Sequence, residues 1–379
     1  MNLGTKNKGR GELRMDKKFD KKIVFEDGTE YYGYGFGAKS DRVCEILFNT
    51  SMVGYQEIIS DPAFTHQLVV MTYPLIGNYG IADEDFEAKV ATIGGLVVRD
   101  YNDMPSNFRY TKTLSETLEE NGIPGIYGVD TRKITRLIRN SGIQKAFITD
   151  ASTSLDDALK ILSNVEIPKD AVSKVSCKKR WYSRTSNHKY NIVAIDCGIK
   201  LSTIKSLNTR DCNVTIVPFD TTAEEIEFIN PDGVLISSGP GNPEDAGVVI
   251  ETVKALSGKY PMFGIGLGHQ IICLAYGAKT YKMKCGHSGA NYPVRNLKNN
   301  KIEITNQAHI YAVDLKSLDN TPLTLTHTNI MDNTVEGVEC KKDKLFSVQY
   351  SPVGTVDKLA DGNLYDKFVN LLEEAKKNA

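Results

Sequence analysis

The stretch FGIGLGHQ, residues 263–270, gives the clearest indication of fold in this chain. An apolar run leads into the glycines Gly264, Gly266 and Gly268, and a helix-like stretch follows. This pattern is typical of a nucleophile elbow, a sharp strand-to-helix turn whose central residue projects its side chain into a site. The central residue here is Gly266, so the pattern predicts an elbow that carries no nucleophile.

The elbow lies within a longer alternation of strand-like and helix-like segments. Short apolar runs, rich in β-branched residues, cover residues 191–196, 213–219, 232–239 and 261–266, and segments with helical periodicity lie between them. Such alternation predicts a mostly parallel sheet with helices on both faces. The elbow follows the fourth run, at the carboxyl end of a strand, where these sheets place their sites. We assign this α/β domain to residues 190–379.

The remainder of the chain divides into three parts. Residues 1–20 are polar and basic, and we expect a flexible tail. Residues 21–150 are expected to form an N-terminal α/β domain, because β-rich runs flank the turn pair Asp27-Gly28 and more strand-like and helix-like segments follow. Residues 151–189 are poor in aliphatic side chains, and we interpret them as a linker or boundary segment. A segment packed across both domains would have the same composition.

Composition indicates a soluble globular protein. The chain has 379 residues, 41% hydrophobic and 25% charged, with a net charge of -1. This balance gives no reason to expect nucleic acid or an anionic membrane as a partner. No apolar run reaches the about 20 residues that a membrane-spanning helix needs. The 7 cysteines are scattered and odd in number, which favours a reducing, cytoplasmic location over a disulfide framework.

A second glycine-rich loop, ISSGPGNPED at residues 236–245, precedes the elbow by one strand. Gly239 and Gly241 would let backbone N–H groups approach a ligand, as an oxyanion hole requires, although a tight connection has the same composition. Cys273 lies about two helical turns beyond the elbow and is expected to pack in the core. The pair Cys285 and His287 lacks a second ligand pair, so no metal site is predicted.

The elbow and the glycine loop together resemble the class I glutamine amidotransferases, whose elbow is G-x-C-x-G-H-Q and whose loop is G-P-G-x-P. Longer stretches resemble the small subunit of carbamoyl phosphate synthetase: FNTSMVGYQEIISDPAF (48–64), TYPLIGNYG (72–80), VDTRKITRLIR (129–139) and GAKTYKMKCGHSGAN (277–291). The resemblance covers nearly everything after about Lys21. The first-domain stretches are the more specific, because other class I amidotransferases lack that domain.

The resemblance implies a glutaminase chemistry that can be checked position by position. In the family a Cys thiolate attacks glutamine, a His moves the proton and a Glu orients the His. Such chemistry needs a thiol of low pKa and a base within hydrogen-bond reach. The Cys position is Gly266 here. The family motif Q-x-H-P-E corresponds to VQYSPV, so the His and Glu positions are Ser351 and Val353. The resemblance therefore predicts that all three members of the triad are lost.

The positions that would hold glutamine are partly retained. Five of them match the family, namely Ser51, Gly239, Gly241, Leu267 and Gln270. The motif Q-N-H-G-F/Y is QAHIY here, so Ala308 replaces an amide, Ile310 replaces a glycine, and Tyr311 keeps an aromatic ring. A branched side chain at Ile310 is expected to fill space that the ligand needs. We interpret the whole as a vestigial glutamine site.

Three functions remain open. The favoured one is a structural or regulatory subunit for a synthetase large subunit that makes carbamoyl phosphate from ammonia, bicarbonate and ATP. The resemblance places ATP and Mg on that large subunit, so no cofactor is expected in this chain. The alternative is a repurposed binding protein whose old pocket recognises another small molecule or regulates a partner. The least favoured is an active glutaminase with an unrecognised nucleophile.

Overall fold

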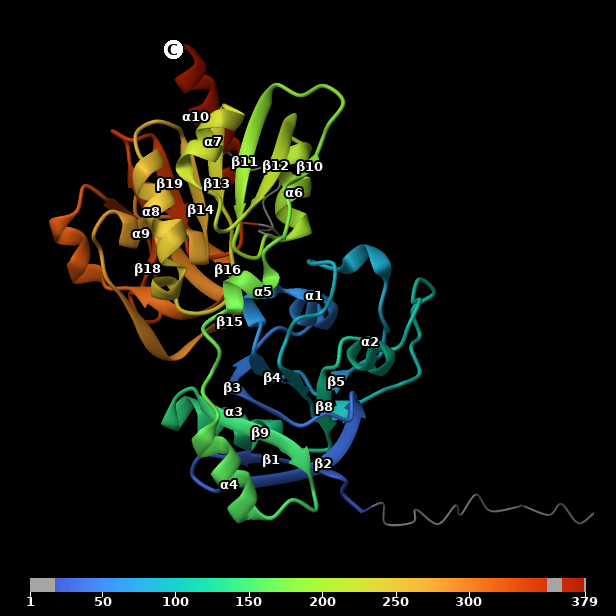
Figure 1. The fold of residues 1–379 in the computed structure, drawn as a ribbon. Helices are drawn as coiled ribbons and strands as arrows, with labels where there is room; N and C mark the ends of the chain where they lie inside the picture. Colours follow the sequence, from blue (N-terminus) through green and yellow to red (C-terminus); the bar gives the residue numbers. More distant parts are fainter. Residues whose placement is uncertain (1–17, 353–362, 378–379) are drawn as a thin grey trace, which may run out of the picture.

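The computed structural model describes residues 18–352 and 363–377, which form two domains joined side by side (Figure 1). Their strands form a closed barrel in the first domain and a large open sheet in the second. Over the described residues, no helix combines the length and apolarity needed to cross a membrane. The mixed α/β architecture expected from the sequence is confirmed in both halves of the chain.

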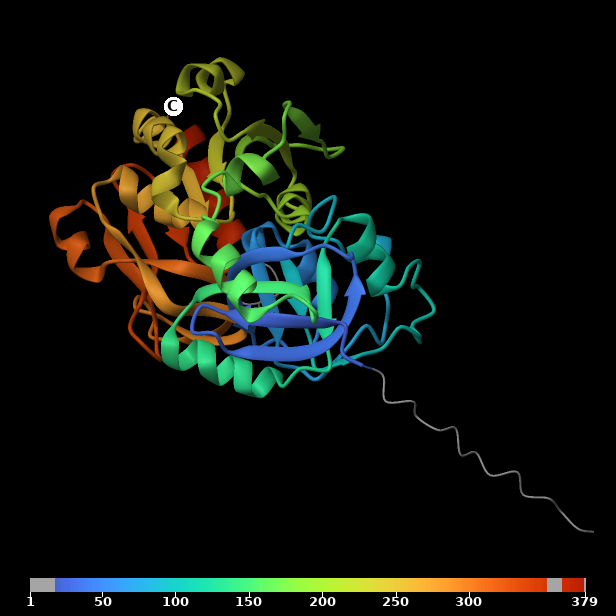
Figure 2. The ribbon, with the colours of Figure 1, turned by 60° about the horizontal axis from the view of Figure 1, so that its bottom comes forward.

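Seven strands close the barrel of the first domain. In barrel order they are β1 (Lys21–Phe25), β2 (Glu30–Gly37), β8 (Pro124–Tyr127), β6 (Gly95–Val97), β4 (Gln67–Met71), β3 (Arg42–Asn49) and β9 (Gln144–Asp150). β1 and β2 form the antiparallel hairpin predicted around Asp27-Gly28. The closure is made by β1 against β9, which lie more than a hundred residues apart in sequence. Figure 2 looks onto this barrel.

Helices of the first domain cover the barrel, and side chains cap the start of two of them, α2 and α3. They are α1 (Tyr55–Ser60), α2 (Leu114–Glu120) and α3 (Thr131–Ser141), with a short strand pair β5 (Leu75–Ile76) and β7 (Asp100–Tyr101) beside them. Thr113 and Glu116 form a reciprocal capping box at the start of α2. The Asp130 side chain accepts a hydrogen bond from the Lys133 backbone at the start of α3. Ile134 and Ile138 of α3 pack into the barrel core.

The second domain is built on one ten-stranded sheet. Its order is β10 (Trp181–Ser183), β12 (Cys212–Pro218), β11 (Tyr190–Asp196), β13 (Gly233–Ile236), β14 (Met262–Ile265), β19 (Leu345–Val348), β18 (Val335–Cys340), β17 (Thr324–Asn329), β15 (Thr280–Asn296) and β16 (Ile302–Val313). The run from β12 to β19 is parallel, as the sequence predicts. The strands from β18 to β16 are antiparallel.

Helices cover both faces of this sheet. They are α6 (Leu201–Asn208), α7 (Ala223–Ile229), α8 (Gly247–Leu256), α9 (Leu267–Ala275) and α10 (Leu364–Lys377). Apolar residues of α7, α8 and α9 share one buried cluster, and those of α6 and α10 share the cluster on the opposite face. Burial on both faces explains why the central strands are almost continuously apolar.

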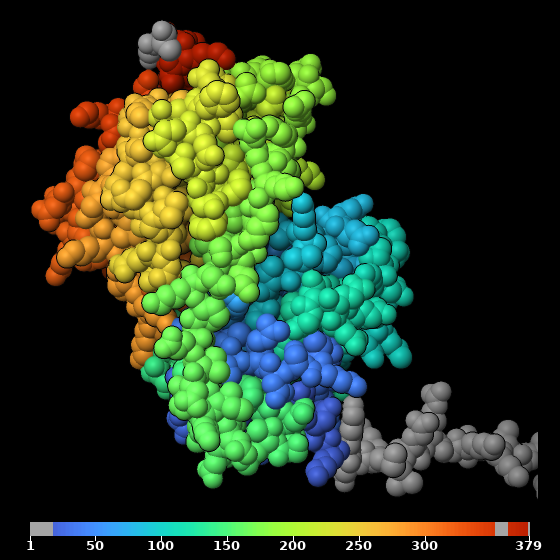
Figure 3. Space-filling model, in the orientation of Figure 1, coloured from blue at the N-terminus to red at the C-terminus, as the bar shows by residue number. Residues whose placement is uncertain are grey.

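The segment between the domains packs against both of them. Helix α4 (Leu155–Asn164) lies on the barrel, where Ala158 and Leu162 contact the cluster that includes Val24. Helix α5 (Ala171–Val175) follows, and Val172 joins the core of the second domain. Strand β10 then pairs with β12 at the sheet edge. Figure 3 shows residues 151–189, in green, running along the surface from one domain to the other.

Contacts between the domains bring β15 and β16 against the barrel. The Thr50 backbone N–H donates to the Ser288 carbonyl at 3.1 Å, and the Asn49 amide donates to the Ser288 hydroxyl at 3.0 Å. On the other side of the junction, the Ser202 hydroxyl donates to the Glu87 carboxylate at 2.6 Å. Ile310 of β16 packs into the core cluster of the first domain. The second domain therefore places residues of its sheet within the first domain's core.

Candidate functional site

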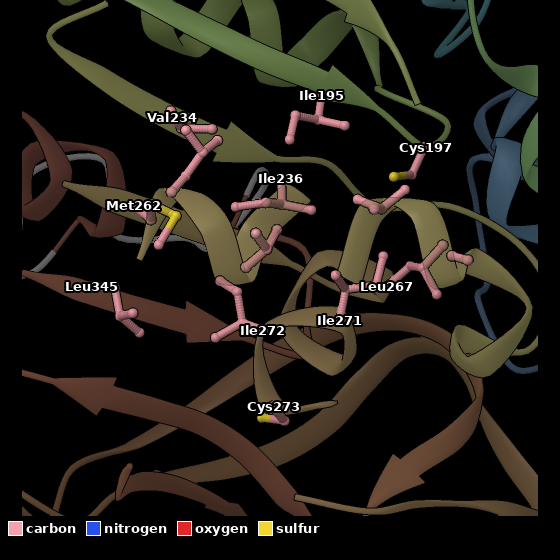
Figure 4. Packing of buried hydrophobic residues seen from close by; sticks show 14 of the residues in the cluster. Ile195, Cys197, Val234, Ile236, Met262, Leu267, Ile271, Ile272, Cys273 and Leu345 are labelled. Atoms are coloured by element: carbon pink, nitrogen blue, oxygen red, sulfur yellow. The ribbon is translucent and has the colours of Figure 1, made fainter. Parts of the chain in front are cut away.

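A strained turn joins β14 to α9 at Gly266. The residue has φ +58° and ψ -112°, a backbone conformation that side-chain-bearing residues rarely adopt. Its N–H donates to the Val348 carbonyl of β19 at 2.9 Å, which ties the turn to the sheet. Figure 4 shows Leu267, Ile271 and Ile272 of α9 packed against β13 and β14 just beyond the turn. The elbow geometry predicted from the sequence is thus present.

In the first turn of α9, the backbone of β13 approaches Gly268 so closely that the position requires glycine. A Cβ atom on this residue would lie 2.2 Å from the Ile236 carbonyl oxygen, a distance that no side chain tolerates. Only glycine allows the helix to sit this close to β13. The Gly268 N–H donates to the Ser237 carbonyl at 3.1 Å and completes the contact. The elbow therefore depends on glycine for packing as well as for conformation.

A small cavity opens at the elbow. We call it the elbow cavity, and it has a volume of about 20 Å³, which is room for about one water molecule. Its walls bring together Gly239, Gly266, Leu267, Ala308 and Ser351. The structure therefore gathers the predicted nucleophile and base positions with part of the predicted glutamine site. Val353 lies outside the described residues.

A buried ion pair forms part of the elbow cavity wall. Lys200 comes from the start of α6 in the second domain, and Asp61 comes from the first domain. Their side chains are 9% and 7% exposed. Burial lowers the pKa of Lys200, but Asp61 and Glu87 outweigh burial and raise it, so the ammonium stays charged. The pair fills one side of the cavity and links the two domains.

Gln270 and Ser51 make hydrogen bonds within the protein. The Gln270 amide donates to the Tyr311 carbonyl at 2.7 Å and to the Gln349 side-chain oxygen at 2.9 Å. The Gln349 amide nitrogen is buried, and among the described residues it has no hydrogen-bond partner. Ser51 is buried in the loop before α1, and its N–H donates to the Asn49 side chain at 2.8 Å.

A second cavity, of about 190 Å³, lies between the domains. We call it the interdomain cavity. Gly241, Ile310 and Tyr311 line it, together with Glu45 of the barrel and Asp245 beyond the glycine loop. Six of the eight predicted glutamine-site residues are thus divided between two cavities, and Ser51 and Gln270 line neither. Ile310 contacts the interdomain cavity and the first-domain core, and does not line the elbow cavity.

None of the seven cysteines lines the elbow cavity as the structure describes it. Cys273 is fully buried in the core of the second domain, as expected, and burial raises the pKa of its thiol (Figure 4). His269 beside it is also fully buried, and its Nδ1 lies 2.8 Å from the Ser347 hydroxyl. The Cys285 thiol faces the Ile138 and Arg139 carbonyls at the end of α3.

A group of polar residues, of which only Asp332 is exposed, was missed at the sequence level. We call it the histidine cluster, and its members are His287, Gln307, His309, Asp332 and Glu336. Glu336 is 0% exposed and burial raises its pKa, although His287 acts against this. Burial lowers the pKa of His287, but Asp332 and Glu336 outweigh burial and raise it to about 9. The sequence did offer one sign of this cluster: Gln307 and His309 are two residues apart, so on a strand their side chains lie on the same face.

The second domain thus combines a largely parallel sheet, covered on both faces, with a strained elbow at the carboxyl end of a central strand. The family model "Glutamine amidotransferase class-I" matches residues 193–370. The model "Carbamoyl-phosphate synthase small chain, CPSase domain" matches residues 23–148, which contain most of the barrel.

Curated relatives match this chain along most of its length and of theirs. The carbamoyl phosphate synthase small chain of Staphylococcus saprophyticus is 49% identical over 93% of this chain and 96% of its own length. That of Staphylococcus haemolyticus is 48% identical over 93% and 96%, and that of Fusobacterium nucleatum is 44% identical over 95% and 100%. The chain belongs to the carbamoyl phosphate synthase small chain family.

Proposed function

We propose that this chain is a small subunit that does not hydrolyse glutamine, and that it supports a large subunit making carbamoyl phosphate from ammonia, bicarbonate and ATP. The observation that carries the proposal is Gly266 on the elbow. The turn retains the conformation that presents a side chain to the cavity, but the residue has no side chain to present. Under this proposal the chain is a pseudoenzyme: it has the fold of its family but no glutaminase activity.

The chemistry of the neighbouring positions supports the same conclusion. A glutaminase of this class needs a thiolate and a base that can accept its proton. Ser351 at the cavity wall has a hydroxyl that is no base at neutral pH, and Val353 in sequence cannot orient a base. Cys273 is fully buried, and burial raises the pKa of its thiol and disfavours the thiolate. In a related triad, removing the nucleophile or the base alone costs about 10⁶ in turnover.

The size of the elbow cavity argues in the same direction. Its volume of about 20 Å³ accommodates about one water molecule and is far smaller than a glutamine side chain requires. Lys200 and Asp61 occupy one wall as an ion pair, and Gln270 is already hydrogen bonded within the protein. We therefore expect at best millimolar affinity for glutamine.

The retained first domain supports a partnership with a large subunit. The relatives are named small chains, and the match to them runs through the barrel as well as the amidotransferase domain. Glutamine chemistry uses few barrel residues, so their retention fits an interface better than a catalytic need. ATP and Mg would bind the large subunit, and the complex would work in the cytoplasm.

The decisive experiment is co-expression of this chain with the large subunit from the same genome. Co-purification is expected, with ATP turnover that rises with ammonium and does not respond to glutamine. Glutamate release above a no-enzyme blank, abolished by thiol alkylation, would contradict the proposal. The variant Gly266→Cys is the matched control, and it should not restore glutaminase activity because the base is also missing.

A repurposed binding protein is the second candidate, and the interdomain cavity of about 190 Å³ is the observation that favours it. It is lined by residues that correspond to the vestigial glutamine site and by carboxylates of Glu45 and Asp245. If no large subunit co-purifies, and ammonium-dependent synthesis is unchanged when this chain is omitted, this second candidate replaces the first.

A further inference from the structure

Three ligand-type side chains converge beneath the β15–β16 ribbon, apart from the elbow cavity. Ring nitrogens of His287 and His309 and a carboxylate oxygen of Glu336 all lie within 4.8 Å of one another. They come from three strands, β15, β16 and β18, and Glu336 is completely buried. A buried carboxylate facing two imidazoles is a mixed nitrogen and oxygen donor set, which suits a divalent metal of the zinc class.

Each imidazole has an acceptor on the side that faces away from the convergence point. His287 Nε2 lies 2.9 Å from the Asp332 carboxylate, and His309 Nδ1 lies 2.7 Å from the Tyr311 carbonyl. In a neutral ring, the proton belongs on the nitrogen that faces the acceptor. The inward nitrogens, His287 Nδ1 and His309 Nε2, then present lone pairs. Outer acceptors of this kind are what orients metal-binding histidines in proteins.

Both inward lone pairs lie closest to an acceptor, and a donor, the Asn329 amide nitrogen, is farther away at 3.5 Å from His287 Nδ1. The Gln307 side-chain oxygen lies 2.9 Å from His287 Nδ1 and 2.8 Å from His309 Nε2. Rotation of the amide would move the conflict to Glu336, because an oxygen would replace the nitrogen that donates to that carboxylate at 3.0 Å and to the Thr305 hydroxyl at 3.2 Å. Acceptors facing acceptors in a buried site are unfavourable unless a positive charge lies between them.

Protons alone relieve only part of this conflict. A proton on His287 Nδ1 would turn one contact into a hydrogen bond. His309 would still have an acceptor against each ring nitrogen, and a neutral imidazole carries a proton on only one of the two. A divalent cation between the two rings and Glu336 relieves every one of these contacts at once.

We propose that His287 Nδ1, His309 Nε2 and the Glu336 carboxylate form a structural site for a zinc-class divalent cation. Asp332 and the Tyr311 carbonyl would orient the two rings. Zinc bonds of about 2.0–2.1 Å to nitrogen place tetrahedral donors about 3.4 Å apart, so small side-chain rotations close the site, with the Gln307 oxygen or water as fourth ligand. The ion would join three strands next to Ser288, which contacts the first domain.

The test uses the untagged full chain, loaded with zinc and then desalted. About one equivalent of zinc per chain is expected to remain, with a raised melting temperature. Glu336→Gln keeps the side chain's shape and should lose the retained zinc. Asp332→Asn should weaken zinc binding by about 10–100-fold. His188→Gln changes an exposed histidine outside the cluster and should bind like the wild type.

Cobalt substitution separates this site from adventitious binding to the free cysteines. A tetrahedral visible spectrum without a cobalt–thiolate charge-transfer band is expected, and it should be absent in Glu336→Gln. Retention of no zinc, equal retention by wild type and Glu336→Gln, or a thiolate band would each overturn the proposal. The cluster would then be a hydrogen-bond network held by protons.

Discussion

The elbow cavity and the histidine cluster share the side chain of Gln307, but they differ in what holds them together. The elbow is defined by backbone: a strained Gly266, and a Gly268 pressed against the Ile236 carbonyl. The histidine cluster is defined by side chains that contact one another in a nearly closed polar network. The main chain sets the shape of the first region, whereas contacts between side chains set the shape of the second.

This difference follows from what each region contributes to the fold. The elbow turn is held by backbone hydrogen bonds, from the Gly266 N–H to the Val348 carbonyl and from the Gly268 N–H to the Ser237 carbonyl, so its shape does not depend on a reactive side chain. Buried ionisable groups cannot be altered one at a time, because removing one partner leaves another charge unpaired. Side chains that serve only a reaction are free of this constraint. The predictions below test this distinction.

The largest effect on stability is expected at the Lys200–Asp61 pair. It lines the elbow cavity, but like the histidine cluster it is held together by contacts between side chains. Lys200→Met leaves a buried carboxylate without its cation and should lower the free energy of unfolding by about 3–5 kcal/mol. Chemical denaturation of the purified chain measures this. The double variant Asp61→Asn/Lys200→Met keeps the oxygen that accepts from Ala63 and should recover most of the loss. Equal destabilisation by single and double variants would show that the pair has no such role.

A pH-dependent loss of stability is expected from two buried histidines beside the sheet. Burial lowers the pKa of His269 to about 3 and that of His327 to about 4, from 6.5. The folded state therefore binds fewer protons than the unfolded chain below pH 6.5, so stability is retained above that pH and lost as the pH falls. Two protons give a limiting slope of about 2.7 kcal/mol per pH unit.

Denaturant unfolding between about pH 6.5 and 4.5 tests this slope. His327→Gln removes one of the two titrating groups and should reduce the slope by about one proton. Its stability at pH near 7.5 serves as the reference, because both rings are neutral there in either state. A wild-type profile that is flat across the acid range would show that burial does not keep these rings neutral.

A smaller effect on stability is expected at Gly266, where the backbone of the elbow is strained. Gly266→Ala places a Cβ atom at φ +58°, 3.3 Å from the Ser238 Cβ, and should cost about 1–3 kcal/mol. Gly247→Ala is the matched control, since its φ is -52° and no atom lies within 4 Å of an added Cβ. That change should stabilise the chain by about 0.4–1 kcal/mol. Similar ΔΔG values for the two variants would contradict a strained elbow.

Local signals in the sequence predicted much of the fold. The Asp27-Gly28 hairpin, the parallel strands and the elbow turn each depend on residues within a few positions of one another. Barrel closure by β1 and β9 could not be predicted, because nothing in either strand specifies a partner more than a hundred residues away. The polar segment 151–189 also gave little sign of α5 and β10, whose structure depends on the second domain.

The sequence predicted the backbone turn of the site, but it did not predict the buried charged groups around the turn. Glycine spacing located the elbow at Gly266 directly. The Lys200–Asp61 pair joins two domains, and the histidine cluster joins three strands, so neither leaves a local pattern. Sequence proximity suggested Cys285 as the companion of His287, but the thiol faces the end of α3 instead. Partner choice in buried polar groups is set by tertiary packing.

The smallest effect is expected at Ser351, and it tests whether the elbow cavity still performs chemistry. Ser351→Ala keeps the backbone N–H that donates to the Asn306 carbonyl at 2.9 Å, so stability should change by no more than about 0.5 kcal/mol. If the hydroxyl had replaced the family's base, the same variant would lower turnover by at least the about 10² that general base catalysis provides. We expect instead that ammonium-dependent ATP turnover with the large subunit stays within about twofold, a change of roughly 0.4 kcal/mol in the barrier. Such an outcome, beside a loss of metal or stability in Glu336→Gln, would show that the Ser351 hydroxyl takes no part in turnover, whereas the buried contacts of the domain contribute to its metal binding or stability.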